Sequence, residues 1–127
     1  MTRINEFYKC RICGNLVNVI EAGAGALVCC GKEMELLKEH TIMQEGKEKH
    51  VPIIKMDGNN LKVKVGSIEH PMSSEHFIEL IQVIQRGRVV AQKQLIPNEK
   101  PEAEFCLQNA GAVKVRALCN IHGLWMN

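Results

Sequence analysis

The stretch HFIELIQVIQRGRVVAQKQLI, residues 76–96, carries the clearest fold signal in this chain. Two apolar runs rich in β-branched residues flank the triplet Arg86-Gly87-Arg88. A short, glycine-containing turn between two such runs is typical of a β-hairpin. The stretch therefore predicts two antiparallel strands joined at residues 86–88.

Apolar and polar residues alternate through much of the chain around this hairpin. NLKVKVGS (60–67) places Leu61, Val63 and Val65 on one strand face, and AEFCLQ (103–108) and AVKVRAL (112–118) alternate in the same way. KHVPIIKMDGNN (49–60) predicts another strand, ending in an Asp-Gly turn. No stretch has sustained helical periodicity with caps at both ends. This spacing favours a small antiparallel β-sandwich or barrel, in which we expect Cys106 to be a buried small apolar residue.

The first 37 residues follow a different pattern and predict a separate module, 1–37, before a β-domain, 38–127. Four of the six cysteines fall here, in CRIC (10–13) and CC (29–30). The intervening GNLVNVIEAGAGALV (14–28) predicts two short strands around a glycine-rich turn. Because the module has too few large side chains for a hydrophobic core of its own, a cross-link must stabilise it.

That cross-link is predicted to be a metal ion bound by four thiolates. The Cys-x-x-Cys loop of Cys10 and Cys13 directs two sulfurs at one ion, and Cys29 and Cys30 complete a tetrahedron that suits zinc or iron. Spacing alone favours zinc over iron, and two disulfides are the least favoured alternative in a cytosolic chain. Adjacent strand residues point to opposite faces, so the backbone must bend at Cys29-Cys30, and Gly31 permits that bend.

Composition excludes some classes of function. The net charge of +2 and the five aromatic residues among 127 argue against nucleic-acid binding. No apolar run is long enough to span a bilayer, and the N-terminal segment has no apolar signal core. We therefore expect a soluble, cytoplasmic protein that binds neither nucleic acid nor membrane.

Four of the five histidines lie beside turn-forming residues, and one of them follows a cysteine by three positions. Any one histidine alone is more commonly exposed or hydrogen-bonded than ligating. As a set they predict loops, each carrying one imidazole, that converge at one end of a β-sandwich. Imidazoles plus one thiolate suit a redox-active metal, and five such ligands leave one octahedral position open. The set is His50, His70, His76, His122 and Cys119, with His40 left out.

Taken in order, the segments YKCRICGN, LVCCG, EKHVP, HPM…EH and CNIHG closely resemble desulfoferrodoxin, the two-iron form of superoxide reductase. The resemblance spans nearly the whole chain. It implies a small rubredoxin-like or desulforedoxin-like module followed by an immunoglobulin-like antiparallel β-sandwich, the neelaredoxin-like domain. It also implies iron, not zinc, at Cys10, Cys13, Cys29 and Cys30, as an accessory electron-transfer centre.

The same resemblance implies a second, reactive iron with four equatorial histidines and an axial cysteine at the matching positions named above. Superoxide would be reduced by one electron to hydrogen peroxide, and a donor, typically rubredoxin, would re-reduce the iron. Lys49 matches the lysine that attracts superoxide, and Glu48 matches the glutamate that ligates ferric iron after product leaves. A homodimer is the family expectation. Many relatives have Glu-Tyr before the axial cysteine, where this chain has Ala117-Leu118.

The sequence also supports expectations for residues near the second iron, and it leaves three alternative functions open. The amides of Ile121 and His122 are expected to donate to the Cys119 sulfur, and Trp125 is expected to be a core anchor. The segment around Glu48 and Lys49 cannot be a flat strand, and Gly46 predicts a mobile loop there. The rival functions are an electron-transfer protein without turnover, a zinc-stabilised binding module and a superoxide dismutase.

Overall fold

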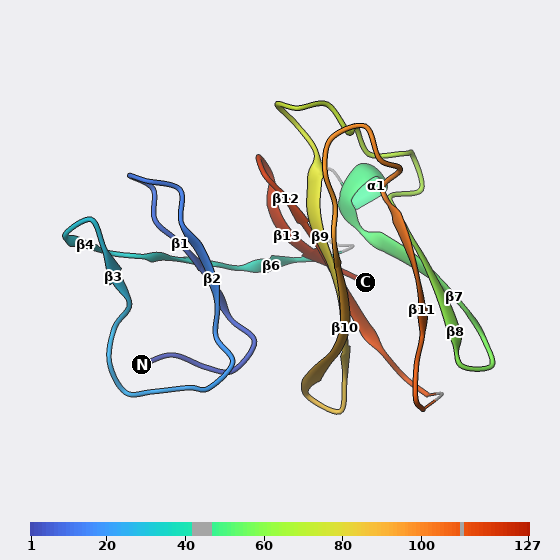
Figure 1. The fold of residues 1–127 in the computed structure, drawn as a ribbon, viewed down its shortest axis with the longest axis horizontal. Helices are drawn as coiled ribbons and strands as arrows, with labels where there is room; N and C mark the ends of the chain where they lie inside the picture. Colours follow the sequence, from blue (N-terminus) through green and yellow to red (C-terminus); the bar gives the residue numbers. More distant parts are fainter. Residues whose placement is uncertain (42–46, 110) are drawn as a thin grey trace. The chain divides into compact units, whose positions relative to one another are not determined.

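The computed structural model of this 127-residue chain describes residues 1–41, 47–109 and 111–127 (Figure 1). The backbone forms two compact units, Met1–Lys38 and Glu39–Asn127. Among the described residues, no helix is long and apolar enough to cross a membrane. Apart from the four-residue helix α1 (Lys47–His50), the regular structure in the described ranges is β-strand, which confirms the predicted fold class.

The N-terminal unit is built from two small antiparallel sheets. β1 (Phe7–Lys9) pairs with β2 (Leu16–Asn18) on one side and β5 (Glu35–Leu37) on the other, and β3 (Val28–Cys29) pairs with β4 (Lys32–Glu33). The two strands expected between the cysteine pairs are therefore present as β2 and β3, but they belong to different sheets. The only buried apolar side chains of this fully described unit are Phe7, Cys10 and Val19.

The bend expected at the adjacent cysteines is the turn of the β3–β4 hairpin. Cys29 pairs with Lys32, so Cys30 and Gly31 are the two turn residues. Their φ angles are +53° and +74°, and positive φ at both central positions is characteristic of the hairpin turn that matches strand twist. Glycine adopts this conformation without strain, whereas Cys30 does so at some cost, which metal ligation can offset.

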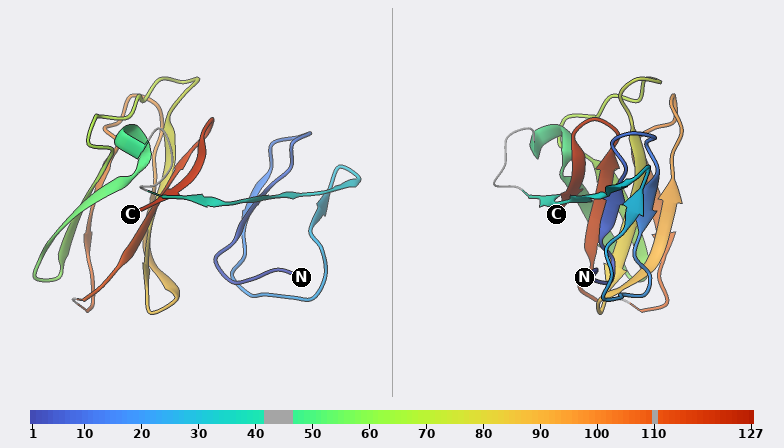
Figure 2. Two further views of the ribbon diagram at one scale, coloured as in Figure 1. Left: turned by 180° about the vertical axis from the view of Figure 1, so that it is seen from behind. Right: turned by 90° about the vertical axis from the view of Figure 1, so that its left-hand side faces the viewer.

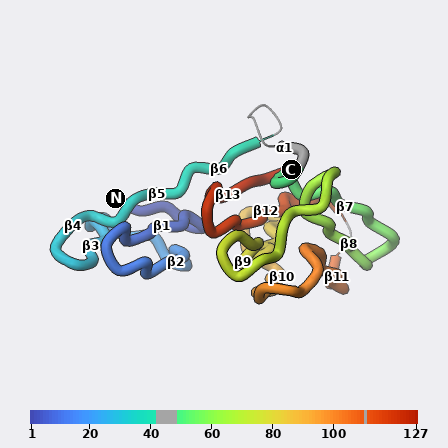
Figure 3. Tube along the Cα trace, turned by 90° about the horizontal axis from the view of Figure 1, so that it is seen from above, coloured from blue at the N-terminus to red at the C-terminus, as the bar shows by residue number. Residues whose placement is uncertain are grey.

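The C-terminal unit is a β-sandwich of a five-stranded and a three-stranded sheet (Figures 2 and 3). The larger sheet has the order β10-β9-β12-β13-β6, and the smaller has the order β11-β8-β7. All pairings within these sheets are antiparallel except β13 with β6. The strands are β6 (Glu39–His40), β7 (Pro52–Asp57), β8 (Asn60–Val65), β9 (Ile78–Gln85), β10 (Arg88–Gln94), β11 (Glu102–Cys106), β12 (Lys114–Cys119) and β13 (Gly123–Met126).

The sandwich core follows the alternation read from the sequence. Leu61, Val63 and Val65 are almost fully buried between the sheets, as predicted. The prediction for Cys106 is wrong, because this side chain is exposed. Ala103 and Leu107 are buried, so the two-residue period of β11 places Cys106, with Glu102 and Glu104, on the outer face.

Two of the predicted turns are present and one is only partly described. Arg86 and Gly87, with φ angles of +54° and +75°, close the β9–β10 hairpin, as the opening stretch predicted. Gly58 has a φ of +62° in the β7–β8 turn. The predicted turn at 109–111 includes Ala110, which lies outside the described residues.

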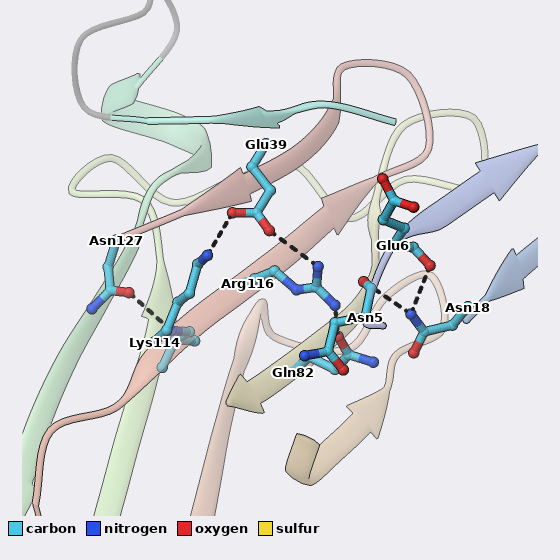
Figure 4. Close-up of polar contacts among 9 residues, drawn as sticks. Asn5, Glu6, Asn18, Glu39, Gln82, Lys114, Arg116 and Asn127 are labelled. Atoms are coloured by element: carbon cyan, nitrogen blue, oxygen red, sulfur yellow. Dashed lines mark hydrogen bonds and ion pairs between the residues drawn. The ribbon is translucent and has the colours of Figure 1, made fainter. Parts of the chain in front are cut away.

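Each unit also has hydrogen bonds or ion pairs of its own between side chains and neighbouring segments (Figure 4). In the C-terminal unit, Glu39 on β6 accepts from Arg116 at 3.2 Å and pairs with Lys114 at 2.9 Å, which ties the short edge strand to β12. Arg116 is 2% exposed and also donates to Gln82, so the buried charge is both paired and hydrogen-bonded. In the N-terminal unit, the amide of Asn18 donates to the carbonyl oxygens of Asn5 and Glu6.

Candidate metal centres

Three connections at one end of the sandwich carry the predicted imidazoles and the cysteine. Figure 1 shows helix α1, the β8–β9 loop and the β12–β13 turn at this end of the unit. The sequence suggested one imidazole per loop, but the structure corrects this, because the β8–β9 loop supplies two of them. His50 ends α1, His70 and His76 lie in the β8–β9 loop, Cys119 ends β12 and His122 lies in the turn that follows.

The four imidazole rings form a square. Neighbouring ring centroids around it are 4.8 Å (His50–His70), 4.8 Å (His70–His76), 4.9 Å (His76–His122) and 4.8 Å (His50–His122) apart. Each neighbouring pair is close to perpendicular, with interplanar angles of 71–79°. Ligand atoms of His50, His76, His122 and Cys119 lie within 4.8 Å of one another. The His70 ring completes the square, but its ligand atom does not lie within that distance of all the others.

Ring nitrogens of the four histidines are suited to a cation. Nε2 of His70 and Nε2 of His76 are buried and have no hydrogen-bond partner in the described structure. His70 Nδ1 lies 2.7 Å from the carbonyl oxygen of Pro71, which can only accept, so Nδ1 carries the proton and Nε2 presents a lone pair. Nε2 of His50 and Nδ1 of His122 are 3.1 Å apart. Buried, unpaired lone pairs of this kind are costly unless a metal binds them.

Burial keeps two of these imidazoles in the neutral form that ligation requires. It lowers the pKa of His70 to about 4, although the Pro71 carbonyl opposes the shift. The pKa of His76 is also lowered, chiefly by burial and further by the nearby His122 and Lys49. Neutral imidazoles bind metal without first losing a proton.

Cys119 supplies a buried sulfur next to the square. Its Sγ lies 3.8 Å from His122 Nδ1, and the residue is 1% exposed. Burial raises the pKa of the Cys119 thiol, whereas the backbone N–H groups of His122 and Ile121 lower it. The His122 amide is 3.4 Å from the sulfur, which confirms the expected donor. A bound cation would therefore complete the stabilisation of a thiolate at this position.

The depressed histidine pKa values predict how the stability of the metal-free protein depends on pH. Unfolded histidine takes up a proton near pH 6.5, whereas folded His70 does so only near pH 4. The stabilisation is therefore complete above pH 6.5 and is lost as pH falls toward 4, by at most about 3 kcal/mol for this residue. Urea unfolding of metal-free protein should show this decline, and His70→Asn should make it shallower. A pH-independent midpoint over this range would contradict the prediction.

Lys49 lies beside the centre, on the turn of helix before His50. Its side chain is exposed, and its charge contributes to the lowered pKa of His76. The side chain of Glu48 lies outside the described part of the chain. The backbone here is the helix α1, so the expectation that this segment is no flat strand is correct. The loop expectation at Gly46 falls outside the described residues.

Trp125 and His40 form an aromatic layer behind the square. Trp125 is 4% exposed and stacks on His50 with centroids 4.6 Å apart and an interplanar angle of 19°. Its Nε1 donates to the carbonyl oxygen of His122 at 3.0 Å. His40 packs on Trp125, with centroids 4.8 Å apart, and forms none of the square's sides. Trp125 is therefore the expected core anchor and also forms a wall of the site. Its position three residues after His122 is only a weak sequence signal for this second role.

The four N-terminal cysteines form a separate cluster whose ligand atoms lie within 4.8 Å of one another. The sulfurs of Cys13 and Cys29 are 3.5 Å apart, and all six cysteines of the chain are free thiols. Amide N–H groups of Cys13 and Ile12 lower the pKa of Cys10 to about 6. Hydrogen bonds to the neighbouring thiols raise the pKa of Cys30 to about 12. A cation bound by all four sulfurs would stabilise their thiolate forms, as in a tetrahedral site with four cysteine ligands.

The chain is similar to proteins of known family over its whole length. The desulfoferrodoxin family profile matches residues 42–127, and the profile of the desulfoferrodoxin N-terminal domain matches residues 2–37. A desulfoferrodoxin homolog from Archaeoglobus fulgidus is 52% identical over 127 residues, covering 100% of this chain and 99% of its own length.

Two further relatives carry the name of an activity. A superoxide reductase from Pyrococcus horikoshii is 37% identical over 97 residues, which are 63% of this chain and 84% of the relative. The crystal structure of the superoxide reductase from Treponema pallidum superposes with a TM-score of 0.78 at 28% identity and covers 96% of each chain. With both family profiles matched in order along its length, this chain belongs to the desulfoferrodoxin family.

Proposed function

We propose that this protein is a superoxide reductase with two iron ions per chain. The observation that carries the proposal is the square of four imidazoles with a buried thiol beside it, in a chain of this family. The ligands of the reactive iron are His50, His70, His76, His122 and Cys119. Cys10, Cys13, Cys29 and Cys30 hold the second iron.

The charge and ligand number of this centre suit superoxide. Four neutral imidazoles and one thiolate around ferrous iron leave about one net positive charge, by formal counting. Five protein ligands are fewer than the six that iron can accept, so an anionic diatomic molecule could also bind the metal. Iron held by these residues would supply the one electron that reduces superoxide, which takes up two protons to form hydrogen peroxide. An external donor returns the electron.

The remaining parts of the proposal concern organisation and partners. Residues 1–37 form an accessory iron module, and residues 38–127 form the reductase sandwich. Rubredoxin is the proposed donor, the protein is proposed to be a homodimer, and its place of action is the cytoplasm. Glu48 is proposed as a further carboxylate ligand that would bind the oxidised iron after peroxide has left.

Lys49 is proposed to attract superoxide to the open position. Its ammonium group is exposed, and it is close enough to the square to affect the pKa of His76. A positive charge at the entrance of a site raises the encounter rate of an anionic substrate, and salt screens the effect. Its three N–H donors can also order water that delivers protons.

Lys49→Ala should slow the oxidation of the reduced protein by superoxide about tenfold at low ionic strength. Anaerobic mixing with pulsed superoxide, followed optically, measures this rate. The wild-type rate should fall as salt is added, and the variant's rate should fall less. Lys55→Ala is the matched control, because Lys55 is an exposed lysine on β7 away from the square.

The same experiment separates the rival functions. Stoichiometric peroxide without oxygen supports a reductase, whereas evolved oxygen indicates a dismutase. A wild-type protein that accepts electrons but leaves superoxide unreduced is an electron-transfer protein. Zinc at both sites of the native protein would overturn the redox function altogether.

A further inference from the structure

We infer that Asn120 is a positioning residue that fixes His76 relative to Cys119 and His122. The inference rests on the proposed assignment of these three residues as iron ligands. Asn120 lies between Cys119 and His122 in the sequence, immediately after β12. It is half-buried.

Asn120 forms hydrogen bonds on both sides of His76. Its backbone N–H donates to the carbonyl oxygen of Phe77 at 3.2 Å, and its side-chain Oδ1 accepts from the backbone N–H of Phe77 at 2.9 Å. Its Nδ2 donates to the carbonyl oxygen of Glu75 at 2.9 Å. The side-chain amide thus binds the residue before His76 and the residue after it.

These bonds replace regular strand pairing where that pairing is interrupted. β12 pairs with β9 in register up to Leu118 opposite Leu80, and the register then shifts so that Cys119 lies opposite Ile78. β9 begins at Ile78, so the segment that precedes it is not part of the β-ladder. An asparagine amide presents a donor and an acceptor in the same geometry as a peptide group, and it can therefore continue the pairing past the bulge.

The other backbone and side-chain hydrogen bonds found at His76 are local to its own loop. Ser73 and His76 bond each other's backbone groups at 3.0 Å and 3.3 Å, and Ser73 Oγ contacts the His76 amide at 3.2 Å. This turn shapes the loop but does not tie it to the β12–β13 turn. The bonds from Asn120 make that tie, so they set the distance between the His76 ring and the Cys119 sulfur.

A metal ligand held by its neighbours is pre-organised, and partners that orient ligands typically affect metal affinity by 10–100-fold. The exposed His122 and half-buried His76 lie on adjacent corners of the square, where packing constrains the rings less than at the buried His50 and His70. Loss of the Asn120 side chain should therefore loosen the His76 corner first.

The test compares Asn120→Ala and Asn120→Asp with wild type, each carrying both irons. Asn120→Ala should lose the iron of the His/Cys centre to a chelator at least about tenfold faster than wild type. The four-cysteine iron should be lost at the wild-type rate. Its sulfur-to-iron absorption band in the oxidised state should also shift. Asn120→Asp retains the acceptor for Phe77 but loses the donor to Glu75, so it should show an effect in the same direction.

Asn60→Ala is the matched control. Asn60 also joins two chain segments through its amide, which donates to Glu104 at 2.7 Å, but it lies at the other end of β8 from the site. It should leave the His/Cys iron and its absorption unchanged. Fluorescence of Trp125, the only tryptophan, offers a second measure of occupancy, because the ring stacks on His50 and bound iron should quench it.

The outcomes distinguish the two proposals. If wild-type protein binds no iron at the His/Cys centre, the proposed function fails and so does the role of Asn120. If wild type binds both irons and both Asn120 variants match it in iron loss and absorption, the positioning role alone is overturned. If Asn120→Ala does not fold, the iron loss and the absorption of Asn120→Asp test the positioning role instead.

Discussion

Cys119→Ser should abolish superoxide reduction while the four-cysteine iron stays bound. The thiolate would be the one anionic ligand of the proposed centre and would donate electron density to the bound iron. Serine is nearly isosteric but is a poor iron ligand and is not deprotonated near neutral pH. Since changes to groups that merely orient ligands already cost 10–100-fold, removal of this ligand should cost at least about 100-fold in rate.

Pulsed superoxide measures the rate, and iron analysis with visible spectroscopy measures each centre. Cys106→Ser is the control, because Cys106 is an exposed thiol on the outer face of β11. It should leave both irons and the rate unchanged. Superoxide reduction at an undiminished rate by Cys119→Ser would remove the thiolate from the mechanism and with it the proposed centre.

Cys10→Ser should unfold the N-terminal unit and leave the sandwich folded. The unit Met1–Lys38 buries only Phe7, Cys10 and Val19 among its apolar side chains, so its fold depends on the metal. Cys10 is 3% exposed, and its sulfur accepts a hydrogen bond from the Cys13 amide at 3.5 Å. Metal binding in such small modules contributes on the order of 10 kcal/mol, comparable to the entire stability of a small domain.

Hydrogen exchange of the intact variant measures this effect by unit. Amides of β1, β2 and β5 should exchange within the dead time, and those of β9 and β12 should keep wild-type protection. The His/Cys iron should also remain bound. Unchanged protection of β1 would show that the unit is stable without its metal and would contradict the argument from its small core.

The two results also bear on the role of the accessory iron. If Cys10→Ser retains the His/Cys iron, the rate of its first oxidation by superoxide tests whether the four-cysteine centre takes part in the reaction. Steady-state turnover with an external donor then tests whether it takes part in re-reduction.

The sequence determined the strand faces, the principal hairpin and the composition of both clusters. Alternation identified Leu61, Val63 and Val65 as core, because a strand with one buried face must place apolar residues at every second position. The same rule, applied consistently, would have placed Cys106 outside, since its neighbours Phe105 and Leu107 face inward. The bend at Cys29-Cys30 also followed from local geometry alone, because no strand presents adjacent side chains to one ion.

Only the tertiary structure decided how the four imidazoles meet and what holds them. His50 and His122 are 72 positions apart, yet their ring nitrogens lie 3.1 Å apart, and no local pattern encodes that distance. The orientation of each ring depends on groups brought in by the fold, such as the Pro71 carbonyl for His70, the Trp125 indole for His50 and the Asn120 amide beside His76. Ligand identity is a property of side chains and can be read from their order, whereas ligand geometry arises from packing between segments that the chain brings together only on folding.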